Sequence, residues 1–347
     1  MSVRAILIAV LLPVAAWAQG FAGLGSQAEG FAAPERGTTF DFPADHGPHP
    51  DYRIEWWYLT ANLSAADGTA YGLQWTLFRS ALAPGERPGW QSPQIWFAHA
   101  AITTPDAHFA TERFARGGIG TAGVTATPFR AWIDEWALEG PDLDTLRMTA
   151  AGPDFRYDMT LDAQGPLVFH GDAGFSVKSE EGQASYYYSQ PFYRISGTLH
   201  LPDGPVEVSG DAWLDREWSS QPLSGRQAGW DWFSLSFEDG DKLMGFQLRN
   251  RDGSGGYTAG TWIAPDGSSE SLPNGAFTAT PLSTQPVAGR RVPTRWQVAV
   301  PDRNLEVTVE AMNANAWMDL SIPYWEGPVT VTGSHTGVGY LEMTGYE

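Results

Sequence analysis

Hydrophobic and polar residues alternate one by one through most of the chain beyond about residue 41. Clear runs place apolar side chains at every second position in 193–201, 296–300 and 305–309. Successive side chains of a strand point to opposite faces, so this period of two predicts half-buried β-strands. A long helical stripe is missing from the pattern, and only Thr103–Arg116 could hold one short helix.

Turn signals separate these runs. Five Asp-Gly pairs, which suit tight hairpin turns, begin at Asp67, Asp203, Asp239, Asp252 and Asp266. Many short antiparallel strands joined by such turns are typical of barrels and sandwiches. The predicted fold class is therefore all-β and antiparallel.

A weak internal similarity divides the chain into two parts. Residues 57–79 contain an aromatic pair, an alternating strand, an Asp-Gly turn, a Gly-x-Gln segment and an arginine, and residues 232–249 contain the same parts in the same order. Chance resemblance between two hairpins is the alternative explanation. We expect two related tandem barrel domains, residues 41–205 and 206–347, that meet near residues 200–225.

The first residues have the pattern of a secretory signal peptide. Arg4 precedes an apolar stretch over residues 5–14, and Ala16-Trp17-Ala18 fits a cleavage site. The apolar stretch is shorter than the roughly 20 residues of a spanning helix, which disfavours a stable membrane span. We predict a signal peptide over residues 1–18, cleavage near Ala18, a flexible leader over 19–40, and a periplasmic or secreted protein.

Composition narrows the classes of partner and chemistry. The 347 residues include 21 Lys plus Arg against 40 Asp plus Glu, and the formal net charge of −19 disfavours nucleic acid as a partner. The absence of cysteine excludes disulfides and thiol nucleophiles. Motifs of serine hydrolases, zinc peptidases and nucleotide enzymes are also missing, so we expect neither a metal nor a cofactor. The 16 tryptophans favour a cavity lined by indole rings over core packing alone.

The most unusual local sequence is Trp213-Leu214-Asp215-Arg216-Glu217-Trp218. In a strand, Asp215 and Glu217 share one face with Trp213, and Arg216 points to the other face. Burial and mutual repulsion would raise the pKa of one carboxyl and make it a general acid. Asp215, Glu217 and Arg216 are the catalytic candidates. The alternative is an arginine–carboxylate pair that pins the junction between the barrels.

Aromatic residues supply the candidate ligand contacts. Glu55 beside three aromatic residues fits a buried polar anchor, and His99 lies in a strongly apolar strand where a core histidine is the usual finding. The residues that we expect to contact a ligand are Trp57, Tyr58, His99, Tyr186, Tyr188, Trp213, Trp230, Trp232, Tyr324 and Trp325.

Together these motifs resemble the AttH and carotenoid 1,2-hydratase-like family. The resemblance rests on residues 55–58, 72–79, 97–100, 184–189, 213–218, 229–233 and 324–327, and it extends from about residue 45 to the C-terminus. It implies two lipocalin-like β-barrels with a ligand bound in or between them. Asp215 corresponds to the proposed acid of the hydratases, which surround it with tyrosine and histidine, whereas Leu214, Arg216 and Glu217 stand here. An adjacent arginine would also keep Asp215 ionised.

Three functions remain open at this point. The departures near Asp215 and the export signal favour an AttH-type protein that binds an apolar, lipid or polyene-like molecule. The resemblance implies a link between such proteins and an ABC transporter. The second hypothesis is an enzyme, either a hydratase of the hydro-lyase class or a secreted hydrolase, with a carboxylic general acid. The third is a carbohydrate-active protein, because two carboxylates in a Trp-lined cleft suit sugars.

Overall fold

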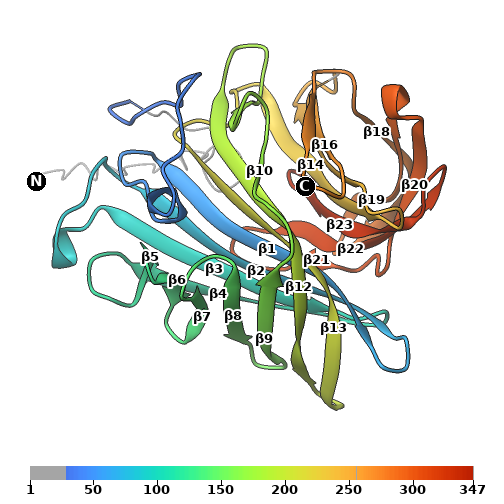
Figure 1. Ribbon diagram of the computed structural model, residues 1–347, viewed down its shortest axis with the longest axis horizontal. Helices are drawn as coiled ribbons and strands as arrows, with labels where there is room; N and C mark the ends of the chain where they lie inside the picture. Colours follow the sequence, from blue (N-terminus) through green and yellow to red (C-terminus); the bar gives the residue numbers. More distant parts are fainter. Residues whose placement is uncertain (1–28, 255, 347) are drawn as a thin grey trace, which may run out of the picture.

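The computed structural model describes residues 29–254 and 256–346. The predicted signal peptide and the first part of the leader lie outside the described residues. Two antiparallel sheets form two barrel-like units, one coloured blue to green and one yellow to red in Figure 1. The all-β prediction is confirmed. None of the helices in the described ranges is long and apolar enough to cross a bilayer.

The first sheet curls into a nearly closed barrel. Its path runs β4-β3-β2-β1-β13-β12-β9-β8-β7-β6-β5, and β10 and β11 add to β12. The strands are β1 (Ile54–Ala65), β2 (Ala70–Ala81), β3 (Gln94–Thr103), β4 (His108–Arg116), β5 (Ala122–Ala126), β6 (Phe129–Ile133), β7 (Trp136–Gly140), β8 (Thr145–Ala151), β9 (Arg156–Ala163), β10 (Val168–Phe169), β11 (Phe175–Val177), β12 (Ala184–Leu201) and β13 (Gly204–Ser219).

The second sheet forms a half-barrel with the path β17-β16-β15-β14-β23-β22-β20-β19-β18, and β21 adds to β22. Its strands are β14 (Gln227–Phe237), β15 (Lys242–Asn250), β16 (Tyr257–Ile263), β17 (Ser269–Leu272), β18 (Thr278–Val287), β19 (Arg290–Val300), β20 (Leu305–Ala311), β21 (Trp317–Met318), β22 (Tyr324–Gly333) and β23 (Gly337–Met343). Short 3-10 turns are η2 (Ala44–His46), η3 (Gly89–Gln91) and η4 (Pro301–Arg303).

All five Asp-Gly pairs lie in turns between strands that pair with each other. Each glycine of these pairs has a positive φ, between 74° and 123°. Glycine adopts such angles at little cost, which is why these short connections can reverse the chain. The two similar hairpins of the sequence are β1–β2 and β14–β15.

Three features differ from the sequence-based expectations. Strand β13 pairs with β1 and β12, so the change of sheet falls after Ser219 and not at residue 206. The stretch that could hold a short helix contains β4, which is paired along its length with β3. The described part of the predicted leader packs on the first barrel, where Phe40 contacts the rings of Tyr186 and Trp218.

Large side chains fill the interiors of both units. Trp57, Trp75 and Trp136 are fully buried in the first core, and Trp296 and Trp325 are fully buried in the second. These rings stabilise the fold by removing apolar surface from water and leave little room inside the cores. Much of the tryptophan excess is therefore structural.

An ion cluster sits inside the first barrel, at the end of β1. Glu55 pairs with Arg79 and with Arg216, whose Nη2 lies 3.2 Å from Oε2. All three side chains are at most 1 % exposed. The Arg216 guanidinium also stacks over Trp57, 3.9 Å from its ring centre. Burial alone would raise the pKa of Glu55, but Arg79, His49 and Arg216 hold it well below its ordinary value.

The outer faces of the two sheets pack against each other. At one end they approach closely, because Gly72 leaves space for Pro328 and the Asn62 amide donates to the Gly339 carbonyl at 2.9 Å. Towards the opposite end, aromatic and acidic side chains hold the sheets apart.

We predict that Glu55→Gln destabilises the protein by about 3–5 kcal/mol, because two buried guanidinium groups lose their counter-charge. Urea unfolding at neutral pH measures this change. Glu139→Gln, which breaks the exposed pair with Arg130, is the control and should cost less than about 1 kcal/mol. Equal effects of both substitutions would contradict the structural role of Glu55.

Candidate functional site

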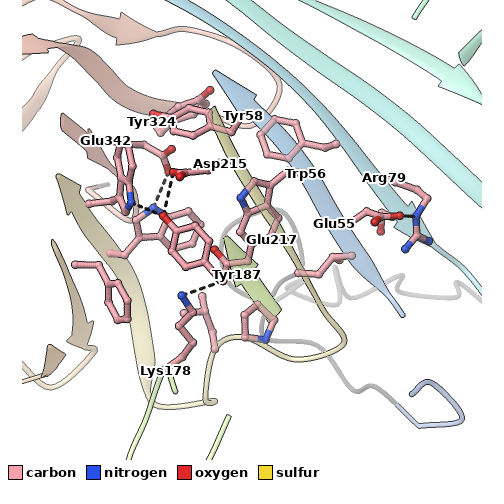
Figure 2. A pocket seen from close by; sticks show the side chains of 18 of the residues that line it. Glu55, Trp56, Tyr58, Arg79, Lys178, Tyr187, Asp215, Glu217, Tyr324 and Glu342 are labelled. Carbon is pink, nitrogen blue, oxygen red and sulfur yellow. Dashed lines mark hydrogen bonds and ion pairs between the residues drawn. The ribbon is translucent and has the colours of Figure 1, made fainter. Parts of the chain in front are cut away.

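A cavity lies between the two sheets, at the end where they separate. It has a volume of about 100 Å³, which is room for several waters or for part of a ligand. β1, β2, β3, β12 and β13 supply one wall, and β14, β15, β22 and β23 supply the other (Figure 2). The lining is mostly apolar and aromatic, and it includes Ile54, Trp56, Tyr58, Phe78, Phe97, Tyr187, Leu223, Trp230, Trp232, Phe246, Leu248 and Tyr324.

The alternation of β13 divides its charged residues between two environments. Asp215 and Glu217 face the cavity, as the strand pattern predicts, while Arg216 points into the first barrel towards Glu55. The expectation that an adjacent arginine keeps Asp215 ionised is therefore wrong, because neighbouring residues of a strand lie on opposite faces. Arg216 also forms no clamp with Asp215 or Glu217.

Asp215 is held by three neutral donors. The Trp213 indole donates to Oδ1 at 2.7 Å, and the Ser189 hydroxyl donates to the same oxygen. The Tyr187 hydroxyl donates to Oδ2 at 3.0 Å and itself accepts from the Trp232 indole at 3.1 Å. No basic side chain pairs with Asp215 among the described residues. Its carboxyl thus has hydrogen bonds but no counter-charge.

Burial decides the protonation of this carboxyl. Asp215 is 2 % exposed, and removal from water raises its pKa to about 7 against the hydrogen bonds from Ser189, Trp213 and Tyr187. The nearby charge of Glu217 raises the pKa further. Near neutral pH, Asp215 is therefore a carboxylic acid with a transferable proton for a substantial part of the time.

A buried histidine lies behind Asp215. His170 Nε2 is 2.6 Å from the Ser189 hydroxyl, and His170 Nδ1 is 2.8 Å from the Thr261 hydroxyl. Burial and then the charge of Lys178 lower the pKa of His170 well below its ordinary value, so the ring is neutral. A neutral ring that accepts from Thr261 and donates to Ser189 fits the direction of the Ser189–Asp215 bond.

Glu217 has a cationic partner of its own. The Lys178 ammonium lies 2.9 Å from Glu217 Oε1, and the Ser185 hydroxyl donates to the same atom. Lys178 also lies over the Tyr187 and Phe246 rings. Glu217 therefore occupies an ion pair, in contrast to Asp215.

The second sheet supplies two further buried carboxyls, of which Glu342 lines the opposite wall of the cavity. Glu342 on β23 accepts from the Trp230 indole at 2.6 Å, and Glu326 on β22 accepts from the Tyr58 hydroxyl at 2.6 Å. Burial raises the pKa of Glu342 to about 7 and that of Glu326 well above its ordinary value. Figure 2 shows Asp215, Glu342, Tyr58 and Tyr324 grouped together, with Glu55 and Arg79 beyond β1.

The predicted ligand contacts fall into two groups. Tyr58, Trp230, Trp232 and Tyr324 line the cavity, and Trp213 contacts Asp215 from its edge. The other group does not reach the cavity, because strand alternation or position turns these side chains into a core. It comprises Trp57, Tyr186 and Tyr188 in the first barrel, Trp325 in the second, and His99 behind Tyr324.

Several residues of the site were not singled out from the sequence. Lys178 and Glu342 were not named at all, whereas Trp56, Tyr187, Ser189 and Glu326 lie in runs that were noted but were not predicted as site residues; they come from strands or loops far apart in the chain. Tyr187 and His170 supply the tyrosine and histidine that the sequence around Asp215 lacks. The Tyr186–Ser189 run carried a partial signal, because its second and fourth residues share the outer face. Within the described ranges, no three His, Asp or Glu side chains are grouped to hold a metal ion.

Comparison with known proteins gives a consistent picture. A family model described as AttH-like matches residues 33–346. A crystal structure of an AttH-type protein from Nitrosomonas europaea is 32 % identical, with a TM-score of 0.83 over 91 % of this chain and 99 % of that one. No curated protein sequence matches the chain.

Two more distant structures share the fold. Kievitone hydratase from Nectria haematococca is 16 % identical, with a TM-score of 0.69 over 92 % of this chain and 97 % of its own. CghA bound to Sch210972 is 14 % identical, with a TM-score of 0.52 over 85 % and 89 %. At these identities the likeness concerns the fold alone.

The raised pKa of Asp215 predicts that this residue lowers the free energy of unfolding more at high pH than at low pH. In the unfolded chain this carboxyl ionises near pH 3.9, but in the folded protein it ionises at about 7. Its contribution to stability therefore falls as pH rises from about 4 to about 7. Urea unfolding of Asp215→Asn and wild type at pH 4 and pH 8 should show the variant gaining up to about 4 kcal/mol relative to wild type. A difference that stays constant with pH would contradict the raised pKa.

Proposed function

The chain belongs to the AttH-like family, and from this premise we propose that it binds an apolar, unsaturated small molecule between its two sheets and adds water to a carbon–carbon double bond. The observation that carries the proposal is a buried carboxylic acid, Asp215, in an aromatic cavity, with no basic partner in residues 29–254 and 256–346. The neighbour kievitone hydratase bears the name of such an activity. Export and a link to an ABC transporter stay predictions of the sequence.

The cavity suits an apolar ligand. Trp56, Trp232, Phe246 and Leu248 contribute flat or branched apolar surface from both sheets. Burying such surface against a ligand gives most of the binding energy, while a few polar groups set the orientation. A sugar would leave most of its hydroxyl groups without partners on this lining, so the carbohydrate hypothesis has less support.

Asp215 is equipped to donate a proton to carbon. Its Oδ1 already accepts two hydrogen bonds, from Ser189 and Trp213, whereas Oδ2 accepts one, from Tyr187. The acidic proton therefore has its place on Oδ2. Transfer of this proton to one alkene carbon breaks the π bond and leaves a cation on the other carbon and a carboxylate on Asp215.

The surroundings favour the cation that forms. The π faces of Trp56 and Trp232 attract positive charge, and the carboxylates of the cavity do so more strongly. Water then adds to the cation, and its spare proton passes to a second carboxylate, for which Glu342 on the opposite wall is placed. The product is an alcohol, and return of one proton to Asp215 completes the cycle.

Binding is tested with Nile red, an apolar dye. We expect enhanced dye emission and quenching of tryptophan fluorescence on mixing. Leu248→Trp fills the cavity and should weaken binding at least about tenfold, a loss of 1.4 kcal/mol or more. Leu82→Trp, at a side chain that is 68 % exposed, is the control. Unchanged affinity in Leu248→Trp would place the dye elsewhere.

Catalysis is tested with a prenylated phenol, whose trisubstituted alkene gives a tertiary cation. In H₂¹⁸O, mass spectrometry should find one added labelled water. Asp215→Asn should lower the rate by about 10²–10⁴-fold, because the amide cannot act as the acid. It should retain Nile red binding.

Asp211→Asn changes an exposed carboxylate of the same strand that pairs with Arg194, and it should retain the wild-type rate. Hydration that persists in Asp215→Asn would exclude this residue as the acid.

A further inference from the structure

We infer that a chain of buried side chains from both sheets, where the two sheets meet, conducts protons between Glu342 in the cavity and Glu112 at the surface. The inference rests on the proposed function, in which Glu342 takes up a proton while a ligand fills the cavity. Tyr58, Glu326, Tyr324 and His99 are the links. Tyr58 and Tyr324 line the cavity, whereas Glu326 and His99 are not among its lining residues.

The inner half of the chain joins two carboxyls through one phenol. Tyr58 and Glu342 line the same cavity and interact electrostatically, and the Tyr58 hydroxyl lies 2.6 Å from Glu326 Oε1. Tyr58 comes from β1 of the first sheet, whereas both glutamates come from the second sheet. The path therefore exists only where the two sheets are packed together.

The outer half reaches the surface through an imidazole. The Tyr324 hydroxyl interacts electrostatically with Glu326 and lies 2.9 Å from His99 Nδ1. Within the described residues, Glu326 Oε2 is buried without a hydrogen-bond partner and is therefore available to Tyr324. On the other side of the ring, His99 Nε2 is 4.0 Å from Glu112 Oε2. The Glu112 side chain is 24 % exposed, and within the described residues its carboxylate is hydrogen-bonded by Ser321 alone, so a rotation that shortens this gap breaks few contacts.

A single set of donor directions fits every link. Glu342 donates to the Tyr58 oxygen, and Tyr58 donates to Glu326. Protonated Glu326 donates to the Tyr324 oxygen, Tyr324 donates to His99 Nδ1, and His99 Nε2–H faces the Glu112 carboxylate. This order requires a neutral His99 and a protonated Glu326, which agrees with the burial of both groups.

The arrangement has no simple structural explanation. His99 Nε2 is buried without a hydrogen-bond partner, and Glu326 is buried without a cation in the described part of the chain. Both features cost stability, and packed apolar residues would avoid that cost. A path for protons accounts for both features, because a bound apolar ligand blocks the direct route through the cavity.

The experiment measures proton exchange rather than turnover. Protein saturated with Nile red is mixed rapidly with D₂O, and infrared spectroscopy follows the shift of the carboxylic acid C=O band that Glu342→Gln removes. Tyr324→Phe breaks the chain in its middle and should slow the exchange at least tenfold. Glu112→Gln changes only the surface end, where folding is not at risk, and should also slow it.

Tyr340→Phe is the matched control, since this buried phenol lies near Glu326 but its hydroxyl has no hydrogen-bond partner among the described residues. It should exchange at the wild-type rate. Wild-type exchange in both Tyr324→Phe and Glu112→Gln, or equal slowing in Tyr340→Phe, would overturn the relay. Failure of the proposed function is distinguishable, because it appears as absent dye binding or as hydration that does not depend on Asp215.

Discussion

The strand alternation of β13 is the constraint on which the rest of the structure depends. Within three consecutive residues it sends Asp215 and Glu217 to the interface and Arg216 to the interior of the first barrel. Arg216 is neutralised there by Glu55, so it cannot compensate the acid on the other face. One thickness of sheet thereby separates the ion cluster of Glu55, Arg79 and Arg216 from a carboxyl whose hydrogen-bond partners in the described part of the chain are all neutral.

This separation explains why the cores and the cavity have different chemistry. The barrel interiors are filled with indole rings and a paired ion cluster, which together make them rigid. The interface holds Asp215, Glu326 and Glu342 at a cost in desolvation. The well-packed cores on both sides supply enough stability to offset this desolvation. Buried carboxyls without a compensating charge are typical of functional sites.

Much of the fold and part of the site were accessible from the sequence. Period-two runs and Asp-Gly turns predicted the antiparallel sheets, and alternation alone placed Asp215 and Glu217 on one face. The sheet membership of β13 was not accessible, because strand pairing is set by partners far away in the chain. Glu342 carries no local signal, and Glu326 stood out only as part of the 324–327 run, since an acidic residue in a strand normally faces solvent and only the second sheet's packing buries these two. Tyr186 and Tyr188 were predicted to contact a ligand but lie in the core of the first barrel. Aromatic composition alone does not distinguish core residues from residues that line a cavity.

The most direct test of the account is the ionisation of Asp215 itself. A ¹³C NMR titration of side-chain carboxyl carbons, with the Asp215 signal assigned by its absence in Asp215→Asn, follows this group without any ligand. The account predicts a midpoint at about 7. A midpoint near the ordinary value of 3.8 would show an ionised carboxylate at neutral pH and would contradict the central claim.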